Sequence, residues 1–158
     1  MATMGGSVAS KFGFSDIIPA LLAVHADIVT YKGGRMSMQE YMNYREKDIL
    51  VEIRIPNHEV PVAIEALRIS RGDFPYLTGS IRHDDTGYKI YIGTRPGAPQ
   101  LAVKASALLS EKGLAALDEA AQIASEELVF QKNSHASKEY RMEMAKAMVR
   151  RLVKEVAQ

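Results

Sequence analysis

The sequence predicts an α+β fold in which a small antiparallel sheet carries C-terminal helices on one face. Three observations support this prediction. Segments with apolar residues at every second position fill much of residues 27–93, and turn-forming residues separate them. Residues 104–156 instead show helical periodicity. Strands that come first and helices that follow are typical of α+β proteins.

The first 55 residues predict one helix and three strands. Ser15 or Asp16 can cap a helix over residues 17–24, where a proline is tolerated in the first turn. The stretch ADIVTYKGGRMSMQEYMN predicts a strand, a turn at Gly33-Gly34 and a second strand. In DILVEIRIP, apolar residues at 49, 51, 53 and 55 alternate with residues 50, 52 and 54, which predicts a strand that ends at Pro56.

The following residues predict three more strands and then three helices. We expect strands near residues 64–69, 77–82 and 88–93, joined by the turns RGDFP and HDDTG. We expect helices over residues 104–112, 114–128 and 137–156, with Ser137 as the N-cap of the last helix. Four side chains of that helix recur every four residues and are expected to form its buried stripe: Tyr140, Met144, Met148 and Leu152.

The composition excludes several classes of site. The chain has 158 residues and a mass of 17.4 kDa, enough for one core with a small appendage. Its 20 Lys and Arg residues balance 19 Asp and Glu residues, so no overall field attracts nucleic acid or a membrane. The absence of cysteine excludes thiolate-bound zinc and iron–sulfur centres held by this chain alone. The absence of cysteine fits a cytoplasmic location, which we expect for this protein. No segment reaches the roughly 18 consecutive apolar residues of a membrane span, so we also expect a soluble protein.

No pattern predicts a catalytic or metal centre on this chain. The histidines lie in separate segments without an i, i+4 partner: His25, His58, His83 and His135. The HDDTG stretch contains His and Asp residues that could suggest a metal site. We interpret it as a hairpin turn instead, because Asp is favoured in such turns, where its side chain bonds the turning backbone. No serine lies in a G-x-S-x-G nucleophile elbow.

The opening TMGGS raises a separate question. Glycine pairs allow close approach of another group, and their backbone N–H groups can reach phosphate oxygens, so this stretch could be a phosphate loop. The same residues are also compatible with a flexible N-terminus. A weaker alternative is a nucleotide site at Gly33-Gly34, a turn that has strand-like flanks and no helix after it.

Four stretches of the chain follow, in order, the motifs of one family. ATMGGSVAS...SDIIPALLAVHADIV resembles T-x-G-G-N...S-D-x-x-P-x-L-x-A-x-x-A, and DILVEIRIP resembles E-I-L-x-x-I-x-I-P. EALRISRGDFPYLTGSIR resembles F-x-K-x-x-R-R-x-x-D-I-A, and SHASKEYRMEMAKAMVRRLV resembles R-x-S-x-E-Y-R-x-x-x-A-x-x-L-x-R-R. The chain thus resembles the FAD-binding, or medium, subunit of molybdenum hydroxylases, the carbon monoxide dehydrogenase and xanthine dehydrogenase family.

The resemblance implies part of an FAD site on this chain. The residues that would lie against the FAD diphosphate are Thr3, Met4, Gly5, Gly6 and Ser7, the last standing where the family has Asn. Asp16 would bond a polar part of the cofactor, and Leu50 would lie near the flavin ring. Arg68 stands where the family has a lysine near the ring's polar edge, and a cation there stabilises anionic reduced flavin.

The resemblance also implies a domain organisation and partners. Residues 1–55 would be part of the FAD-binding subdomain, and residues 56–158 would be the C-terminal domain of the flavoprotein subunit. The family's N-terminal subdomain, with the other glycine-rich loop, would come from a longer protein or a separate chain, or the chain would be a remnant that no longer binds FAD. FAD would relay electrons from an iron–sulfur small subunit, which receives them from a molybdenum-cofactor large subunit, to NAD or another acceptor.

A second hypothesis comes from a different class of protein. The chain would be a cofactor-free assembly or docking module of such a complex. Thr3–Ser7 would then be disordered, and Arg68 would be a surface cation without a role in binding.

Overall fold

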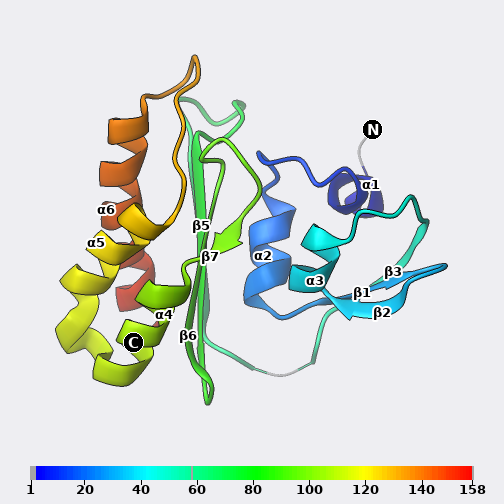
Figure 1. Ribbon diagram of the computed structural model, residues 1–158, viewed down its shortest axis with the longest axis horizontal. Coiled ribbons are helices and arrows are strands. Elements are labelled where there is room, and N and C mark those ends of the chain that lie inside the picture. Colours follow the sequence, from blue (N-terminus) through cyan, green and yellow to red (C-terminus); the bar gives the residue numbers. More distant parts are fainter. Residues whose placement is uncertain (1–2, 58, 158) are drawn as a thin grey trace.

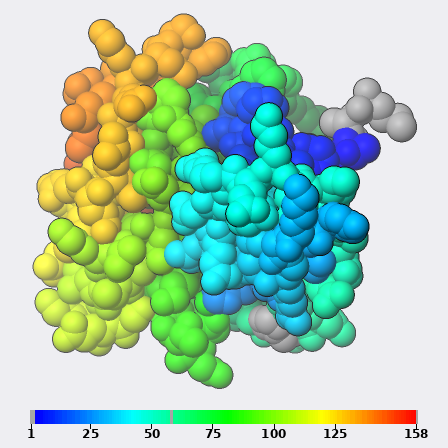
Figure 2. Space-filling model, turned by 45° about the vertical axis from the view of Figure 1, so that its right-hand side comes forward, coloured from blue at the N-terminus to red at the C-terminus, as the bar shows by residue number. Residues whose placement is uncertain are grey.

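A four-stranded antiparallel sheet lies in the middle of the molecule and separates two groups of elements (Figure 1). The computed structural model describes residues 3–57 and 59–157. Three C-terminal helices cover one face of this sheet, and the N-terminal elements lie on its other side. Figure 2 shows the blue-to-cyan N-terminal elements packed directly against the green sheet. The predicted α+β class, with C-terminal helices on one face of the sheet, is confirmed.

The N-terminal part contains a small three-stranded sheet and three short helices. The helices are α1 (Met4–Ala9), α2 (Ile17–Ala23) and α3 (Met38–Asn43). The strands are β1 (Asp27–Thr30), β2 (Gly34–Ser37) and β3 (Leu50–Arg54), in the antiparallel order β2-β1-β3. The predicted helix and the three strands are present, whereas α1 and α3 were not expected from the sequence.

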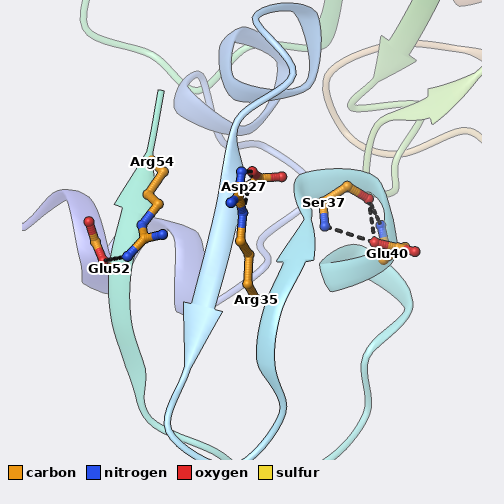
Figure 3. A network of polar contacts seen from close by, with 6 residues as sticks. All are labelled: Asp27, Arg35, Ser37, Glu40, Glu52 and Arg54. Carbon is orange, nitrogen blue, oxygen red and sulfur yellow. Dashed lines mark hydrogen bonds and ion pairs between the residues drawn. The ribbon is translucent and has the colours of Figure 1, made fainter. Parts of the chain in front are cut away.

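Helix α3 corrects the prediction that the strand after Gly33-Gly34 continues through MQEYMN. The strand ends at Ser37, whose side-chain oxygen accepts the N–H of Glu40 at 3.1 Å. The Glu40 carboxylate accepts the Ser37 N–H in return at 2.8 Å, which completes a capping box (Figure 3). The pattern Ser-x-x-Glu carries this signal in the sequence, because the two side chains satisfy first-turn N–H groups reciprocally.

The strand at residues 50–54 departs from the expected alternation. The pairing of β3 with β1 shifts its register, so that Thr30 lies opposite Leu50 while Val29 lies opposite Glu52. Leu50 and Ile53 both pack against the N-terminal core as a result. The prediction of one uninterrupted period of two is wrong here, because a bulge inserts an extra residue and changes which side chains face the core. Three apolar side chains in or next to β3 are exposed to solvent: Ile49, Val51 and Ile55.

The central sheet consists of β4 (Val62–Leu67), β5 (Leu77–Asp84), β6 (Gly87–Gly93) and β7 (Gln100–Leu101). Its strand order is β4-β5-β6-β7, and all neighbours are antiparallel. The three predicted strands are confirmed, although β4 begins two residues earlier than expected and β7 was not expected. Ser80 donates from its hydroxyl to the Pro19 carbonyl at 2.8 Å, which ties α2 to this sheet.

The C-terminal helices are α4 (Val103–Lys112), α5 (Leu117–Glu127) and α6 (Lys138–Val156), with a 3₁₀ turn η1 (Gly113–Ala116) between the first two. The Ser137 hydroxyl accepts the N–H of Tyr140 at 3.1 Å, which confirms the predicted N-cap. The C-terminal helices share one buried core with β4, β5 and β6. A Cβ atom at Gly79 would lie 2.3 Å from the Met148 sulfur, so a larger residue at this point of β5 would force the Met148 side chain of α6 to move.

The predicted buried stripe of α6 is only half correct. Met148 and Leu152 are buried, but Met144 is only partly buried and Tyr140 is 48% exposed. A step of four residues turns the helix by more than one full turn, so a strict row of fourth residues drifts around the surface. Arg141 is buried in place of Tyr140. Among the described residues, no helix combines the length and the hydropathy needed to cross a bilayer.

Candidate functional site

The TMGGS stretch forms the start of helix α1. The Thr3 hydroxyl oxygen accepts the N–H of Gly6 at 3.1 Å, and the Thr3 carbonyl accepts the N–H of Ser7 at 3.0 Å. The expectation of a disordered segment is wrong, because this cap and the first helical bond order it. The N–H groups at Met4 and Gly5 belong to the first turn, where no intrahelical acceptor exists. They are therefore suited to an acceptor outside the helix.

The two glycines of this turn have different surroundings. A Cβ atom at Gly5 would lie 3.9 Å from a methyl group of Leu50, which is an ordinary contact. A Cβ atom at Gly6 would lie 3.0 Å from the Thr3 hydroxyl oxygen and would disturb the cap. Gly5 and Leu50, two of the residues that the resemblance assigned to FAD, therefore lie side by side, while Gly6 leaves room for the Thr3 cap.

Asp16 and Arg68 also lie together, although 52 positions separate them. The Arg68 Nη2 atom lies 2.5 Å from the Asp16 Oδ1 atom, and Nη1 donates to the Asp73 carbonyl at 2.8 Å. The Asp16 side chain makes no cap hydrogen bond in α2, because the Ser15 hydroxyl oxygen accepts the Ile18 N–H at 3.3 Å instead. The two side chains remain partly exposed, at 51% for Asp16 and 25% for Arg68.

Three phenylalanines lie close in sequence to Asp16 and Asp73, the two partners of Arg68, and the sequence analysis did not single them out. The rings of Phe12 and Phe14 stack with centroids 5.0 Å apart and an angle of 12°. The ring of Phe74 meets Phe14 at 4.5 Å with a tilt of 51°. The sequence shows the close spacing of Phe12 and Phe14, but the contact with Phe74 is long-range and only the structure reveals it.

The segment that carries Phe12 and Phe14 is fastened to the end of β6. The Thr94 hydroxyl donates to the Gly13 carbonyl at 2.8 Å. A Cβ atom at Gly13 would lie 2.8 Å from the Gly97 carbonyl carbon, so glycine permits this close approach. Arg141 donates from Nη1 to the Thr94 carbonyl at 2.6 Å. The buried core of the C-terminal helices therefore holds the segment between α1 and α2.

The Gly33-Gly34 turn does not offer a phosphate site of the kind considered above. The Asp48 carboxylate accepts the N–H groups of Gly33 at 2.9 Å and Lys32 at 3.0 Å. Desolvation raises the pKa of Asp48, but the hydrogen bonds from Gly33, Thr30, Lys32 and Ile49 outweigh it and hold the pKa far below its ordinary value. An anion of the chain itself thus occupies the amides that a phosphate would need.

The histidines that the structure describes do not gather into a metal site. Within residues 3–57 and 59–157, no group of three His, Asp or Glu side chains could hold a metal ion. His83 stacks on the Tyr88 ring at 3.9 Å, and Asp84 accepts the N–H and the hydroxyl of Thr86, as expected of a turn. His58 lies outside the described residues.

Comparison with known proteins defines the class of this chain. The family described as the CO dehydrogenase flavoprotein C-terminal domain matches residues 63–156, which is more than half of the chain. The chain belongs to this family, whose members form the C-terminal domain of the flavoprotein subunit in molybdenum hydroxylases. No curated protein sequence matches the chain.

Solved structures with the same fold include chains of two kinds of oxidoreductase. Quinoline 2-oxidoreductase from Pseudomonas putida 86 matches with 20% identity and a TM-score of 0.83. A Cu,Mo-CO dehydrogenase in a cyanide-inactivated form matches with 23% identity and a TM-score of 0.84. CO dehydrogenase from Hydrogenophaga pseudoflava, which lacks the Mo-pyranopterin moiety, matches with 24% identity and a TM-score of 0.84. Each comparison covers 99% of this chain and 61% of the matched chain, and shows the shared fold.

Proposed function

We propose that this chain is a portion of the flavoprotein subunit of a molybdenum hydroxylase and forms one side of an FAD site. One observation carries the proposal: Asp16 and Arg68, both assigned to FAD by the resemblance, contact each other across 52 positions. Membership of the flavoprotein family supports it. When bound, FAD supplies the redox chemistry, and the protein supplies binding, orientation and electrostatics.

The residue types suit the roles that we propose for them. The N–H groups of Met4 and Gly5 and the hydroxyls of Thr3 and Ser7 can donate to phosphate oxygens. Leu50 offers an apolar contact for a ring beside this turn, since its methyl group lies against Gly5. Arg68 stays positively charged and favours a negative charge on a neighbouring ring edge, while Asp16 holds its guanidinium in place.

The proposed organisation follows from the same assignment. Residues 1–55 form part of the FAD-binding subdomain, and residues 56–158 form the C-terminal domain. The rest of the flavin pocket, an iron–sulfur small subunit and a molybdenum-cofactor large subunit are supplied by the remainder of the complex. Electrons pass through the FAD to NAD or another acceptor. The cytoplasmic location stays a prediction.

A specific observation favours the alternative of a cofactor-free docking module. Strand β3 lies at one edge of its sheet, and the exposed apolar side chains Ile49, Val51 and Ile55 lie in or next to it. An unpaired edge with apolar side chains is a ready template for another strand. In this alternative the chain contributes only a surface for assembly, and substitutions at Arg68 leave its binding properties unchanged.

Titration of the purified chain with FAD separates the two functions. We expect weak, saturable quenching of flavin fluorescence that Arg68→Gln reduces about tenfold, because a charge-assisted contact is lost. The matched control is Arg35→Gln: Arg35 pairs with Asp27 at the same 2.5 Å, but on the outer face of the small sheet (Figure 3). Equal affinities for the wild type and both variants, or no saturation at millimolar FAD, would favour the docking module.

A further inference from the structure

The rings of Phe12, Phe14 and Phe74, which we call the phenylalanine ladder, form an exposed aromatic surface outside the residues that the family resemblance assigns to FAD. They are 54%, 38% and 65% exposed, respectively. Phe12 stacks on Phe14, and Phe14 contacts Phe74, so the three rings are continuous across two loops that lie far apart in the sequence. In Figure 2 the blue N-terminal segment lies against the green loop near the top of the molecule. A contiguous exposed apolar patch of a few hundred Å² is often a functional surface.

The ladder is held in place on both sides. Gly13, between the first two rings, is fixed by the Thr94 hydroxyl and by its close approach to Gly97. Phe74 follows Asp73, whose carbonyl accepts a hydrogen bond from Arg68. A surface whose loops are already ordered loses less conformational entropy on binding. The ladder is therefore preorganised for a ligand.

Arg68 places a polar edge next to the ladder. One guanidinium nitrogen bonds Asp16, two residues after Phe14, and the other bonds the residue before Phe74. Arg68 thus bridges the two loops that carry the rings. A guanidinium has donors only, so a ring that lies on the ladder and faces Arg68 must offer an acceptor such as a carbonyl oxygen. The isoalloxazine ring offers two carbonyl oxygens together with ring nitrogens on one edge, whereas the acceptors of adenine are single ring nitrogens, so the flavin edge matches the fork of donors better.

The size of the ladder favours a ring over a protein partner. With about 200 Å² for a phenylalanine side chain, the three rings together expose roughly 300 Å². A stable protein interface needs about 800 Å² from each partner. A flat heteroaromatic ring covers an area of the right order, and nucleic-acid bases bind proteins by the same stacking on aromatic side chains.

We infer that the phenylalanine ladder is a stacking surface for the isoalloxazine ring of the flavin. This inference rests on the proposed function and adds three residues to the site. It assigns the ring's aromatic contact to Phe12, Phe14 and Phe74 and its polar edge to Arg68.

The four phenylalanines of the chain provide a direct test by NMR. Ring signals of ¹³C-labelled phenylalanine are followed while riboflavin, which lacks phosphate and adenine, is added up to its solubility limit. We expect shifts at Phe12, Phe14 and Phe74 and none at Phe130, which is buried in the C-terminal core. Absence of shifts at the ladder, or shifts of equal size at Phe130, would overturn the inference.

Variants complete the test. We expect Phe74→Leu to weaken riboflavin and FAD binding about fivefold, because an apolar side chain remains but the aromatic contact is lost. Tyr31→Leu is the matched control, since Tyr31 is 76% exposed next to the β1–β2 turn. Shifts caused by ADP in place of riboflavin would assign the ladder to adenine and refute the inference. FAD binding that depends on Arg68 but leaves the ladder signals unmoved would refute it while sustaining the proposed function, whereas no binding at all would overturn both.

Discussion

Replacement of Arg141 by Met is expected to destabilise the protein strongly, because the side chain is buried and donates several hydrogen bonds. Arg141 is fully buried, and within the described residues no carboxylate pairs with it. Its guanidinium donates to the carbonyls of Tyr76 and Thr94 and to the Asn133 side chain. Burial lowers its pKa, yet the group stays charged.

The magnitude follows from the groups that lose their donor. Asn133 is exposed and can turn to water, but the carbonyls of Tyr76 and Thr94 are at least partly buried. A buried acceptor left without a partner costs about 1–3 kcal/mol, so two of them cost about 2–6 kcal/mol. Release of a buried charge offsets part of this cost. We expect a net loss of about 3 kcal/mol, or roughly 6–12 °C in Tm for a chain of this size.

Urea unfolding followed by circular dichroism measures this loss. The matched control is Arg151→Met on the same helix, because Arg151 is 49% exposed and pairs with Glu65 at 2.7 Å. An exposed ion pair is worth at most about 1 kcal/mol. If Arg141→Met were no less stable than Arg151→Met, the guanidinium would not be what holds the end of β6, and the account of how the core fixes the Gly13 segment would fail.

Three further changes test other parts of the structure. Gly79→Ala should cost about 1–3 kcal/mol in urea unfolding, since its Cβ would lie 2.3 Å from a side-chain sulfur of α6. Gly6→Val should break the Thr3 cap and speed amide exchange in α1, whereas Gly5→Ala should not. Asp48 has a lowered pKa in the folded state, so its stabilisation is present above about pH 4 and is lost as the pH falls; Asp48→Asn should therefore lower stability at pH 7 and flatten the acid limb of unfolding curves.

The sequence predicted the elements whose signals are local. Ser137 caps α6 because its hydroxyl oxygen accepts a backbone N–H three residues ahead, and this depends on neighbouring residues only. The capping box of Ser37 and Glu40 is an equally local signal. It was missed because the preceding residues alternate like a strand, and the strand was predicted to continue. The bulge in β3 could not be predicted, because it arises from the pairing with β1 and leaves no composition signal.

The candidate site shows the same division between local and distant contacts. The resemblance assigned Asp16 and Arg68 separate roles, but nothing in the sequence states that their side chains meet at 2.5 Å. The alternative role of Asp16 as a helix cap was compatible with its position, and only the structure gives that role to Ser15. The contact of Phe14 with Phe74 depends on the same fold of two distant loops. Sequence motifs therefore identify candidate residues, while their grouping comes from tertiary packing.

Packing also explains why the candidate site does not belong to either group of elements alone. The core beneath the C-terminal helices draws all its buried members from residues 63–156, the range of the family match. The N-terminal core, however, includes Tyr91 of β6, and α2 is bonded to Ser80 of β5. Asp16 lies among the N-terminal elements, and Arg68 directly follows β4 of the central sheet. The distance between the two side chains therefore depends on how the N-terminal elements pack against the sheet. The central sheet is thus the support on which both halves of the site are aligned, and the buried contacts of Arg141 and Thr94 fix that alignment from the other side.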